Sequence, residues 1–308
     1  MLRIAVSLWS MILLLCLSAS GGGGPLDRLG RASADSGQAK IQPQVPAGQA
    51  GAKAIPTATT FPRYLIPLPG ETPTPGIRIP AERQILLTFD DGPDLQGTPL
   101  IMEELDRRKL RAVFFVMGQH IVRNRPEDLA RRELLRKLSV HGHHVGNHTM
   151  NHKDLCQNQG VLAQEIDRAA ELITYATGVR PVLFRSPYGA RCRALDRALA
   201  ERDMIQVGWN ADPREWRGNS DTAIFNIVTN QLARATGPVI LLLHDKNLAV
   251  VQALPRILDW IEQEKARVAR EGGVPIRIVD YSVYLPAVAA DIPANAAAGV
   301  PKSPQAVQ

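Results

Sequence analysis

The sequence predicts an α/β fold in which short parallel strands alternate with longer helices. Two observations support this prediction. Between residues 84 and 282, short β-rich segments alternate with segments of helical periodicity. Some strand segments, such as 239–243, are apolar at every position, which is typical of parallel strands covered by helices on both faces. Seven strands that alternate with six helices indicate a wound sheet or an irregular (β/α)7-type barrel in a single domain.

Each predicted element follows from a local pattern. The strand segments are 84–89, 111–116, 143–147, 181–185, 204–209, 238–243 and 275–280. Between them, apolar and charged residues recur at helical spacing, and we expect helices at 98–109, 127–140, 161–177, 192–203, 221–236 and 250–270. The last helix is expected to end near Gly272, because glycine commonly follows a helix C-terminus.

The two ends of the chain have a different composition. Residues 1–20 combine Arg3, an apolar stretch and a run of small residues, which is the layout of a secretory signal peptide. Its retention as an N-terminal anchor is the alternative. Residues 21–60 indicate a flexible low-complexity linker, and residues 286–308 indicate a disordered Ala/Pro-rich tail. Residues 61–285 have a length suited to one domain.

Charge and cysteine content narrow the functional classes. The chain of 308 residues has a formal net charge of +6, but the signal-like start argues against a nucleic-acid partner, as do basic residues on predicted helix faces. A basic surface favours an anionic polymer of the cell envelope. Cys156 and Cys192 each follow a candidate site motif. An exported protein tolerates a disulfide between them, and two free thiols are the alternative.

Chemically active side chains follow five of the predicted strands. In chain order they are Asp90, Asp91, His148, His152, Arg185, Asp212, Trp216 and His244. Because the carboxyl ends of parallel barrel strands converge on one face, we expect these side chains to meet in one pocket.

Asp90 and Asp91 are adjacent at the end of the first strand, before Gly92 and Pro93. Two like charges at the end of a buried strand repel each other, so such a pair usually needs a cation or a division of roles. One carboxylate could bind a metal ion while the other acts as a base. An ordinary Asp-Gly-Pro turn after a strand is the alternative interpretation.

His148 and His152 are four residues apart, and one helical turn would direct both imidazoles at a common point. With one carboxylate they would form a ligand set that leaves positions open for water and substrate, as catalytic zinc requires, although non-haem iron uses the same ligand types. His141, His143 and His144 lie just upstream, so a nonspecific His-rich segment competes with this interpretation. We assign His143 and His144 to strand structure.

Five segments occur in an order and spacing that indicate a family. They are T-F-D-D-G-P at 88–93, H-T-M-N-H at 148–152, R-S-P-Y-G at 185–189, W-N-A-D-P-R-E-W at 209–216 and L-L-L-H-D at 241–245. Together they resemble the polysaccharide deacetylases, the carbohydrate esterase family four group with a NodB-homology domain. The resemblance covers about 83–282 and implies that the barrel is of the NodB-homology kind, within a catalytic domain at 61–285.

The resemblance implies a metal site and a base. Asp90 would be the general base, and Asp91, His148 and His152 would bind a divalent metal. Zn²⁺ is the expected ion, with Co²⁺ or another divalent ion as the alternative. Arg185 would hold Asp90 oriented and ionised, because an opposite charge lowers the pKa of a carboxylate. A purely structural salt bridge is the alternative for Arg185.

The resemblance also implies residues that contact the substrate. The backbone N–H of Tyr188 would stabilise the oxyanion, and Gly189 would let the turn approach the substrate closely. His244 would protonate the leaving amine. Leu242, on the same side of its strand as His244, would line a pocket for the acetyl methyl group, with plain core packing as the alternative.

The fourth motif departs from the family pattern D-x-x-D-W, because its second acid is Glu215 rather than Asp. The extra methylene leaves open which of Asp212 and Glu215 orients Arg185 or His244. Trp216 would stack on a sugar ring or pack in the interior.

The resemblance therefore implies metal-dependent removal of N-acetyl groups from an N-acetylhexosamine polymer of the envelope, peptidoglycan or a chitin-like glycan, with release of acetate. The alternatives are an O-acetyl esterase acting on a polysaccharide such as xylan, and a catalytically silent carbohydrate-binding relative. The implied partner is an acetylated glycan, without nucleic acid, and membrane contact is expected only through an N-terminal anchor. We expect a monomer that is exported to the periplasm, the envelope or the exterior.

Overall fold

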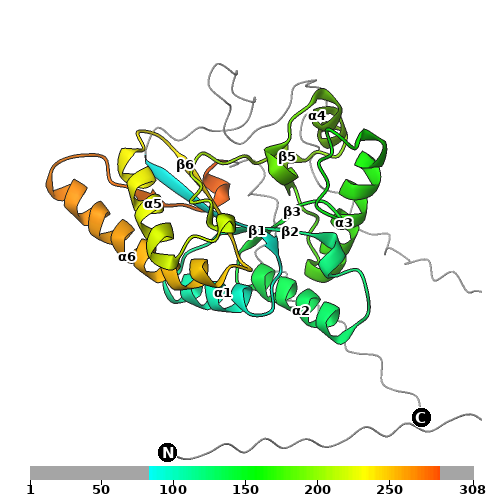
Figure 1. Ribbon diagram of the computed structural model, residues 1–308, viewed down its shortest axis with the longest axis horizontal. Helices are drawn as coiled ribbons and strands as arrows, with labels where there is room; N and C mark the ends of the chain where they lie inside the picture. Colours follow the sequence, from blue (N-terminus) through cyan, green and yellow to red (C-terminus); the bar gives the residue numbers. More distant parts are fainter. Residues whose placement is uncertain (1–82, 285–308) are drawn as a thin grey trace, which may run out of the picture. The chain divides into compact units, whose positions relative to one another are not determined.

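A computed structural model describes residues 83–284, and these form a seven-stranded parallel sheet (Figure 1). The strands are β1 (Gln84–Gly92), β2 (Val113–Val116), β3 (His144–Asn147), β4 (Leu183–Phe184), β5 (Ile205–Gln206), β6 (Val239–His244) and β7 (Arg277–Ile278). Their order is β5-β4-β3-β2-β1-β6, and β7 also pairs with β1. All seven predicted strands are confirmed, although β4, β5 and β7 are shorter than expected.

The sheet curls towards a barrel. After β5 the chain returns to β6, where Ala211 forms an isolated parallel bridge with Leu241. The N–H of Leu242 donates to the carbonyl of Ala211 at 2.9 Å. Within residues 83–284 no continuous ladder joins β5 to β6, so this short contact spans the gap. The predicted irregular barrel is confirmed.

Six α-helices connect the strands in the described part of the chain. They are α1 (Gly97–Arg107), α2 (Pro126–Val140), α3 (Leu162–Thr177), α4 (Arg193–Ala200), α5 (Asp221–Arg234) and α6 (Leu248–Arg270). Short 3-10 segments are η1 (Gly118–His120), η2 (Gln159–Val161), η3 (Pro187–Gly189), η4 (Glu215–Arg217) and η5 (Tyr281–Val283). The predicted helices are confirmed to within a few residues. No helix among these residues is long and apolar enough to cross a membrane.

Local chemistry explains several helix ends. Pro126 begins α2, where its fixed φ suits the first helical position and its missing N–H costs no hydrogen bond. The hydroxyl of Ser220 accepts a hydrogen bond from the N–H of Ala223 and caps α5. Gly178 follows α3 with a φ of 76°, a left-handed conformation that glycine adopts without strain.

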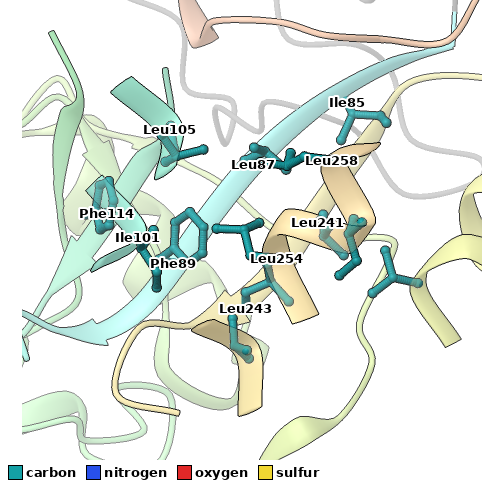
Figure 2. Close-up of a cluster of buried hydrophobic side chains, with 14 of the residues drawn as sticks. Ile85, Leu87, Phe89, Ile101, Leu105, Phe114, Leu241, Leu243, Leu254 and Leu258 are labelled. Carbon is teal, nitrogen blue, oxygen red and sulfur yellow. The ribbon is translucent and has the colours of Figure 1, made fainter. Parts of the chain in front are cut away.

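Two apolar clusters lie on opposite faces of β1. Leu87 and Phe89 point outward to the main core, where Leu254 of α6 packs against the sheet (Figure 2). Leu86 points inward and belongs to a second cluster with residues of β2 and β6. Because side chains alternate along a strand, Asp90 follows Thr88 on the inner side. Burial of one leucine side chain stabilises the fold by about 1.5–3 kcal/mol. The positions of the apolar residues along β1 therefore determine which side chains face the barrel interior.

The strand register brings polar residues together at one end of the sheet. In the β1–β6 pair, Asp90 lies opposite His244 and Thr88 lies opposite Leu242. In the β2–β3 pair, Val116 lies opposite Asn147, the residue before His148. The carboxyl ends of β1, β3 and β6 therefore present their polar residues at the same edge.

The expected signal peptide or anchor at 1–20, linker at 21–60 and tail at 286–308 lie outside the described residues. The expected domain at 61–285 is described from residue 83 to residue 284.

Cys156 and Cys192 form a disulfide with Cα atoms 5.7 Å apart. Cys156 follows the segment that carries His152, and Cys192 is the N-cap residue of α4, directly after the segment that carries Tyr188. The crosslink therefore joins two loops that contribute to the candidate site.

Replacing both cysteines by serine is expected to lower the free energy of unfolding. The bridge closes a chain segment with a sequence separation of 36, and a loop of that size corresponds to about 2–4 kcal/mol. Chemical denaturation of the purified chain and of Cys156→Ser/Cys192→Ser measures the difference. Equal midpoints, together with thiols at Cys156 and Cys192 that react without reductant in the unfolded chain, would contradict the crosslink.

Candidate active site

A backbone irregularity at the end of β1 separates the two adjacent carboxylates. Asp90 is in the regular ladder, whereas Asp91 has a left-handed φ of 70° and the β1–β2 register shifts between Asp90 and Gly92. Such a bulge re-aims side chains that would otherwise point to opposite faces. A side chain at Gly92 would clash with the carboxylate of Asp245, so the end of β1 packs directly on the residue after His244.

Arg185 is fully buried and holds Asp90. Its Nη1 donates to Asp90 Oδ1 at 2.8 Å and to the hydroxyl of Thr88 at 2.7 Å. Its Nε and Nη2 donate to the carbonyl oxygens of Val207 and Gly208. Burial lowers the pKa of Arg185, although the charge of Asp90 opposes this effect. Removing one partner of a buried pair of this kind costs about 3–5 kcal/mol, because the other charge is left unpaired.

Asp91, His148 and His152 form a candidate metal site. One ligand atom from each lies within 4.8 Å of the others. Asp91 Oδ1 is 3.5 Å from His148 Nε2 and 3.3 Å from His152 Nε2. Ligand atoms about 2.0–2.1 Å from a tetrahedral zinc ion lie about 3.3 Å apart, so these separations fit a common ion. Asp91 Oδ1 is also buried without a hydrogen-bond partner, as expected for an atom reserved for a metal.

Both histidines are oriented through Nδ1. The Nδ1 of His148 is 2.7 Å from the carbonyl oxygen of Arg185, and that of His152 is 3.3 Å from the Tyr188 hydroxyl. A neutral imidazole that donates from Nδ1 keeps the Nε2 lone pair for a metal. Burial, together with the neighbouring His148, lowers the pKa of His152 and favours this neutral form.

The prediction of a helical turn from His148 to His152 is wrong. The segment is a loop after β3, with left-handed φ values of 68° at Thr149 and 56° at His152. The N–H of His152 donates to the Thr149 hydroxyl, and the N–H of Thr149 donates to the amide oxygen of Asn147. Side-chain hydrogen bonds, rather than a helix, therefore position the two imidazoles.

His244 is held by Glu215. The ring Nδ1 and the backbone N–H of His244 each lie 2.8 Å from Glu215 Oε1, and Glu215 is fully buried. The other ring nitrogen, Nε2, is 3.9 Å from Asp91 Oδ2 and points into the site. Burial alone would lower the pKa of His244, but the hydrogen bond to Glu215 and the charge of Asp90 outweigh burial and raise it. Asp212 instead accepts the N–H of Arg214, so of the two acids Glu215 contacts His244.

The other predicted site residues surround this centre. Tyr188 is 72% exposed with a φ of 60°, and Gly189 has a φ of 67°. A Cβ at Gly189 would lie 3.0 Å from the ring of Trp209, so packing also requires glycine here. Trp216 is 58% exposed, which excludes the expected alternative of interior packing. Leu242 is buried on the same side of β6 as His244.

Two residues near Asp91 and the loop from His148 to His152 (the histidine loop) were not predicted from the sequence. Lys246 Nζ lies 2.8 Å from Asp91 Oδ2, the oxygen that does not face the histidines. Glu165 of α3 is buried and accepts two hydrogen bonds from Asn151 in the histidine loop. Burial alone would raise the pKa of Asp91, but the contacts with His148 and Lys246 hold it well below its usual range. The only sequence signal for Lys246 is its place two residues after His244, and Glu165 has none.

Fold and site together define a hydrolase built on a curled α/β barrel, and comparisons with known proteins give the family. The family model for polysaccharide deacetylase matches residues 78–207. A chitooligosaccharide deacetylase from Bradyrhizobium sp. (strain ANU 289) is 33% identical over 165 residues, which cover 53% of this chain and 71% of the relative. A peptidoglycan-N-acetylglucosamine deacetylase from Bacillus cereus is 30% identical over 160 residues, which cover 51% of this chain and 54% of the relative.

A solved structure has the same fold. The family 4 carbohydrate esterase from Streptomyces lividans, determined in complex with acetate, aligns with a TM-score of 0.52 at 30% identity, over 60% of this chain and 90% of that chain. The chain belongs to the polysaccharide deacetylase family. The expected family, its NodB-type barrel and the enzyme class are confirmed.

The three-ligand site predicts that loss of His152 weakens zinc binding, whereas loss of His141 does not. His152→Ala removes one of three protein ligands and is expected to weaken zinc binding by more than about 100-fold. His141→Ala is the matched control, because His141 is exposed and hydrogen-bonded to Asp106 rather than to the site. Isothermal titration of the metal-stripped chains with Zn²⁺ measures both. Equal affinities in the two variants would show that His152 is not a ligand.

Proposed function

We propose that this chain removes N-acetyl groups from N-acetylglucosamine-containing glycans of the cell envelope by metal-dependent hydrolysis. The observation that carries the proposal is the convergence of three differently held groups at one barrel edge. These are a carboxylate paired with a buried arginine, a metal-ligand triad, and a histidine held by a buried carboxylate. The names of the relatives, which act on chitooligosaccharide and on peptidoglycan, support the same chemistry.

Asp91, His148 and His152 would hold the divalent ion, and the donor set of two imidazoles and one carboxylate suits Zn²⁺, or Co²⁺ as the alternative. Bound there, such an ion would lower the pKa of water and polarise the acetyl carbonyl.

Asp90 is suited to take the proton of the attacking water. Arg185 engages Asp90 Oδ1, which leaves Oδ2 on the side of His148, 3.8 Å from its Nε2. As the water oxygen bonds to the acetyl carbon, its proton passes to Asp90. The hydrogen bond from Arg185 to Oδ1 orients Asp90 for this step.

His244 is suited to donate the second proton. Glu215 binds Nδ1–H and leaves Nε2 directed into the site. When the carbon–nitrogen bond breaks, the amine takes a proton from Nε2, and the products are acetate and a free amino sugar. The raised pKa of His244 favours the protonated ring that this step requires.

The other roles remain part of the proposal. The N–H of Tyr188, next to Gly189, would stabilise the oxyanion, and Leu242 would line the space for the acetyl methyl group. Trp216 is exposed, which suits stacking on a sugar ring. The catalytic domain would span 61–285, and the chain would act as an exported monomer on an acetylated glycan, without nucleic acid and with an N-terminal anchor as its only membrane contact.

Acetate release by the purified full chain across peptidoglycan, chitooligomers and acetylxylan tests this function. We expect release from the N-acetylated glycans, loss of activity with a chelator, and recovery with zinc or cobalt. Release from acetylxylan alone would favour the esterase alternative. Release that persists after exhaustive metal removal would contradict the metal-dependent reaction, and no release from any glycan would favour the silent binding relative.

The contact between Glu215 and His244 predicts a shift in the pH profile. The donor must be protonated, so kcat/KM falls as pH rises through the pKa of His244. Glu215→Gln removes the charge that raises this pKa, and the alkaline limb is expected to move to lower pH. Asp212→Asn, the other acid of the motif, is the control and should leave the limb in place. Identical alkaline limbs in wild type and Glu215→Gln would contradict the assignment.

A further inference from the structure

A pocket of about 640 Å³ lies along the segment between β5 and α5, and part of its wall belongs to α5. Trp209 forms one wall, and its ring also packs beside Gly189 and lies 5.6 Å from the guanidinium of Arg185. Arg217 forms another wall, two residues after the glutamate that holds His244. Two residues of 3-10 helix advance only about 4 Å, so the backbone of Arg217 lies close to that of Glu215.

Most polar side chains in the pocket wall are used to hold its own backbone. The side chain of Gln231 accepts the N–H of Asp212 and donates to the carbonyl of the same residue. Asn219 donates to the carbonyls of Pro213 and Arg214. These groups fix the shape of the pocket and have little capacity left for a ligand.

The guanidinium groups of Arg214 and Arg217 are the exception. Both residues are exposed, and within residues 83–284 neither side chain has a hydrogen bond or ion pair. Arg217 lies over the ring of Trp216, with its guanidinium carbon 4.7 Å from the ring centroid. By contrast, Arg136 and Arg267 on the helices are paired with neighbouring glutamates. The acid that shares the pocket, Asp212, has one carboxylate oxygen occupied by the N–H of Arg214.

We propose that this pocket is a carboxylate subsite, which accepts an acidic group on the sugar next to the one that is deacetylated. This inference rests on the proposed function. Guanidinium groups bind carboxylates with paired, charge-assisted hydrogen bonds, and an aromatic ring beside them suits the apolar face of a sugar. A neutral chitin-like chain would leave both cations without a partner. A peptide-free glycan with alternating N-acetylglucosamine and N-acetylmuramic acid would supply one free carboxylate at every second residue.

The test compares three glycans with the full chain loaded with zinc: peptide-free strands of alternating N-acetylglucosamine and N-acetylmuramic acid, the same strands with the carboxyl groups reduced to alcohols, and chitooligomers. The wild-type KM is expected to be lowest for the acidic strands. In Arg214→Gln/Arg217→Gln, the ratio of kcat/KM for acidic over reduced strands should fall about tenfold, mainly through KM. Added salt should have a similar effect on the wild type, because both cations are exposed.

Arg270→Gln is the matched control. Arg270 is an exposed arginine at the C-terminal end of α6, just before β7 begins, and so belongs to the opposite end of the sheet. It should keep the wild-type ratio. An unchanged ratio in the double variant, or an equal preference of the wild type for acidic and reduced strands, would overturn the subsite. Absence of acetate release from all three glycans would instead count against the proposed function, so the two failures are distinguishable.

Discussion

The buried charge of Arg185 is the constraint on which the site depends. A guanidinium with no exposed surface must be paired, because leaving it unpaired costs several kcal/mol. Asp90 supplies the charge, and the carbonyls that follow β5 supply further acceptors. This arrangement joins β1, β4 and the segment after β5 at one point inside the barrel. Because Arg185 pairs with Asp90, the adjacent Asp91 is a second negative charge that needs its own cations.

The carboxylate of Asp91 contacts a different set of groups from that of Asp90. Asp91 turns away through a left-handed backbone and faces His148 and His152, while Lys246 binds its other oxygen. The bulge at the end of β1 gives each carboxylate separate partners, which is the geometry that the proposed division of roles requires. The disulfide and the contact between His152 and Tyr188 tie the two loops that complete the site.

The strands were predictable because parallel strands covered on both faces are apolar at nearly every position, as in β6. The convergence of Asp90, His148 and His244 followed from the same topology. The loop from His148 to His152 was not predictable, because Asn147 and the distant Glu165 set its conformation through hydrogen bonds that leave no local pattern. The sequence could not show whether Asp212 or Glu215 contacts His244, because this depends on which side chain lies next to the ring in the folded chain. The hydrogen bond between Glu215 and His244 distinguishes the two acids.

The central claim is that two neighbouring carboxylates have different roles, and a comparison of Asp90→Asn with Asp91→Asn tests it most directly. Zinc bound per chain and acetate released per chain are measured on both purified variants. The account predicts that Asp90→Asn retains zinc and glycan binding but loses turnover, whereas Asp91→Asn loses zinc and turnover together. Loss of zinc in both variants, or retention of zinc in Asp91→Asn, would contradict the division of roles.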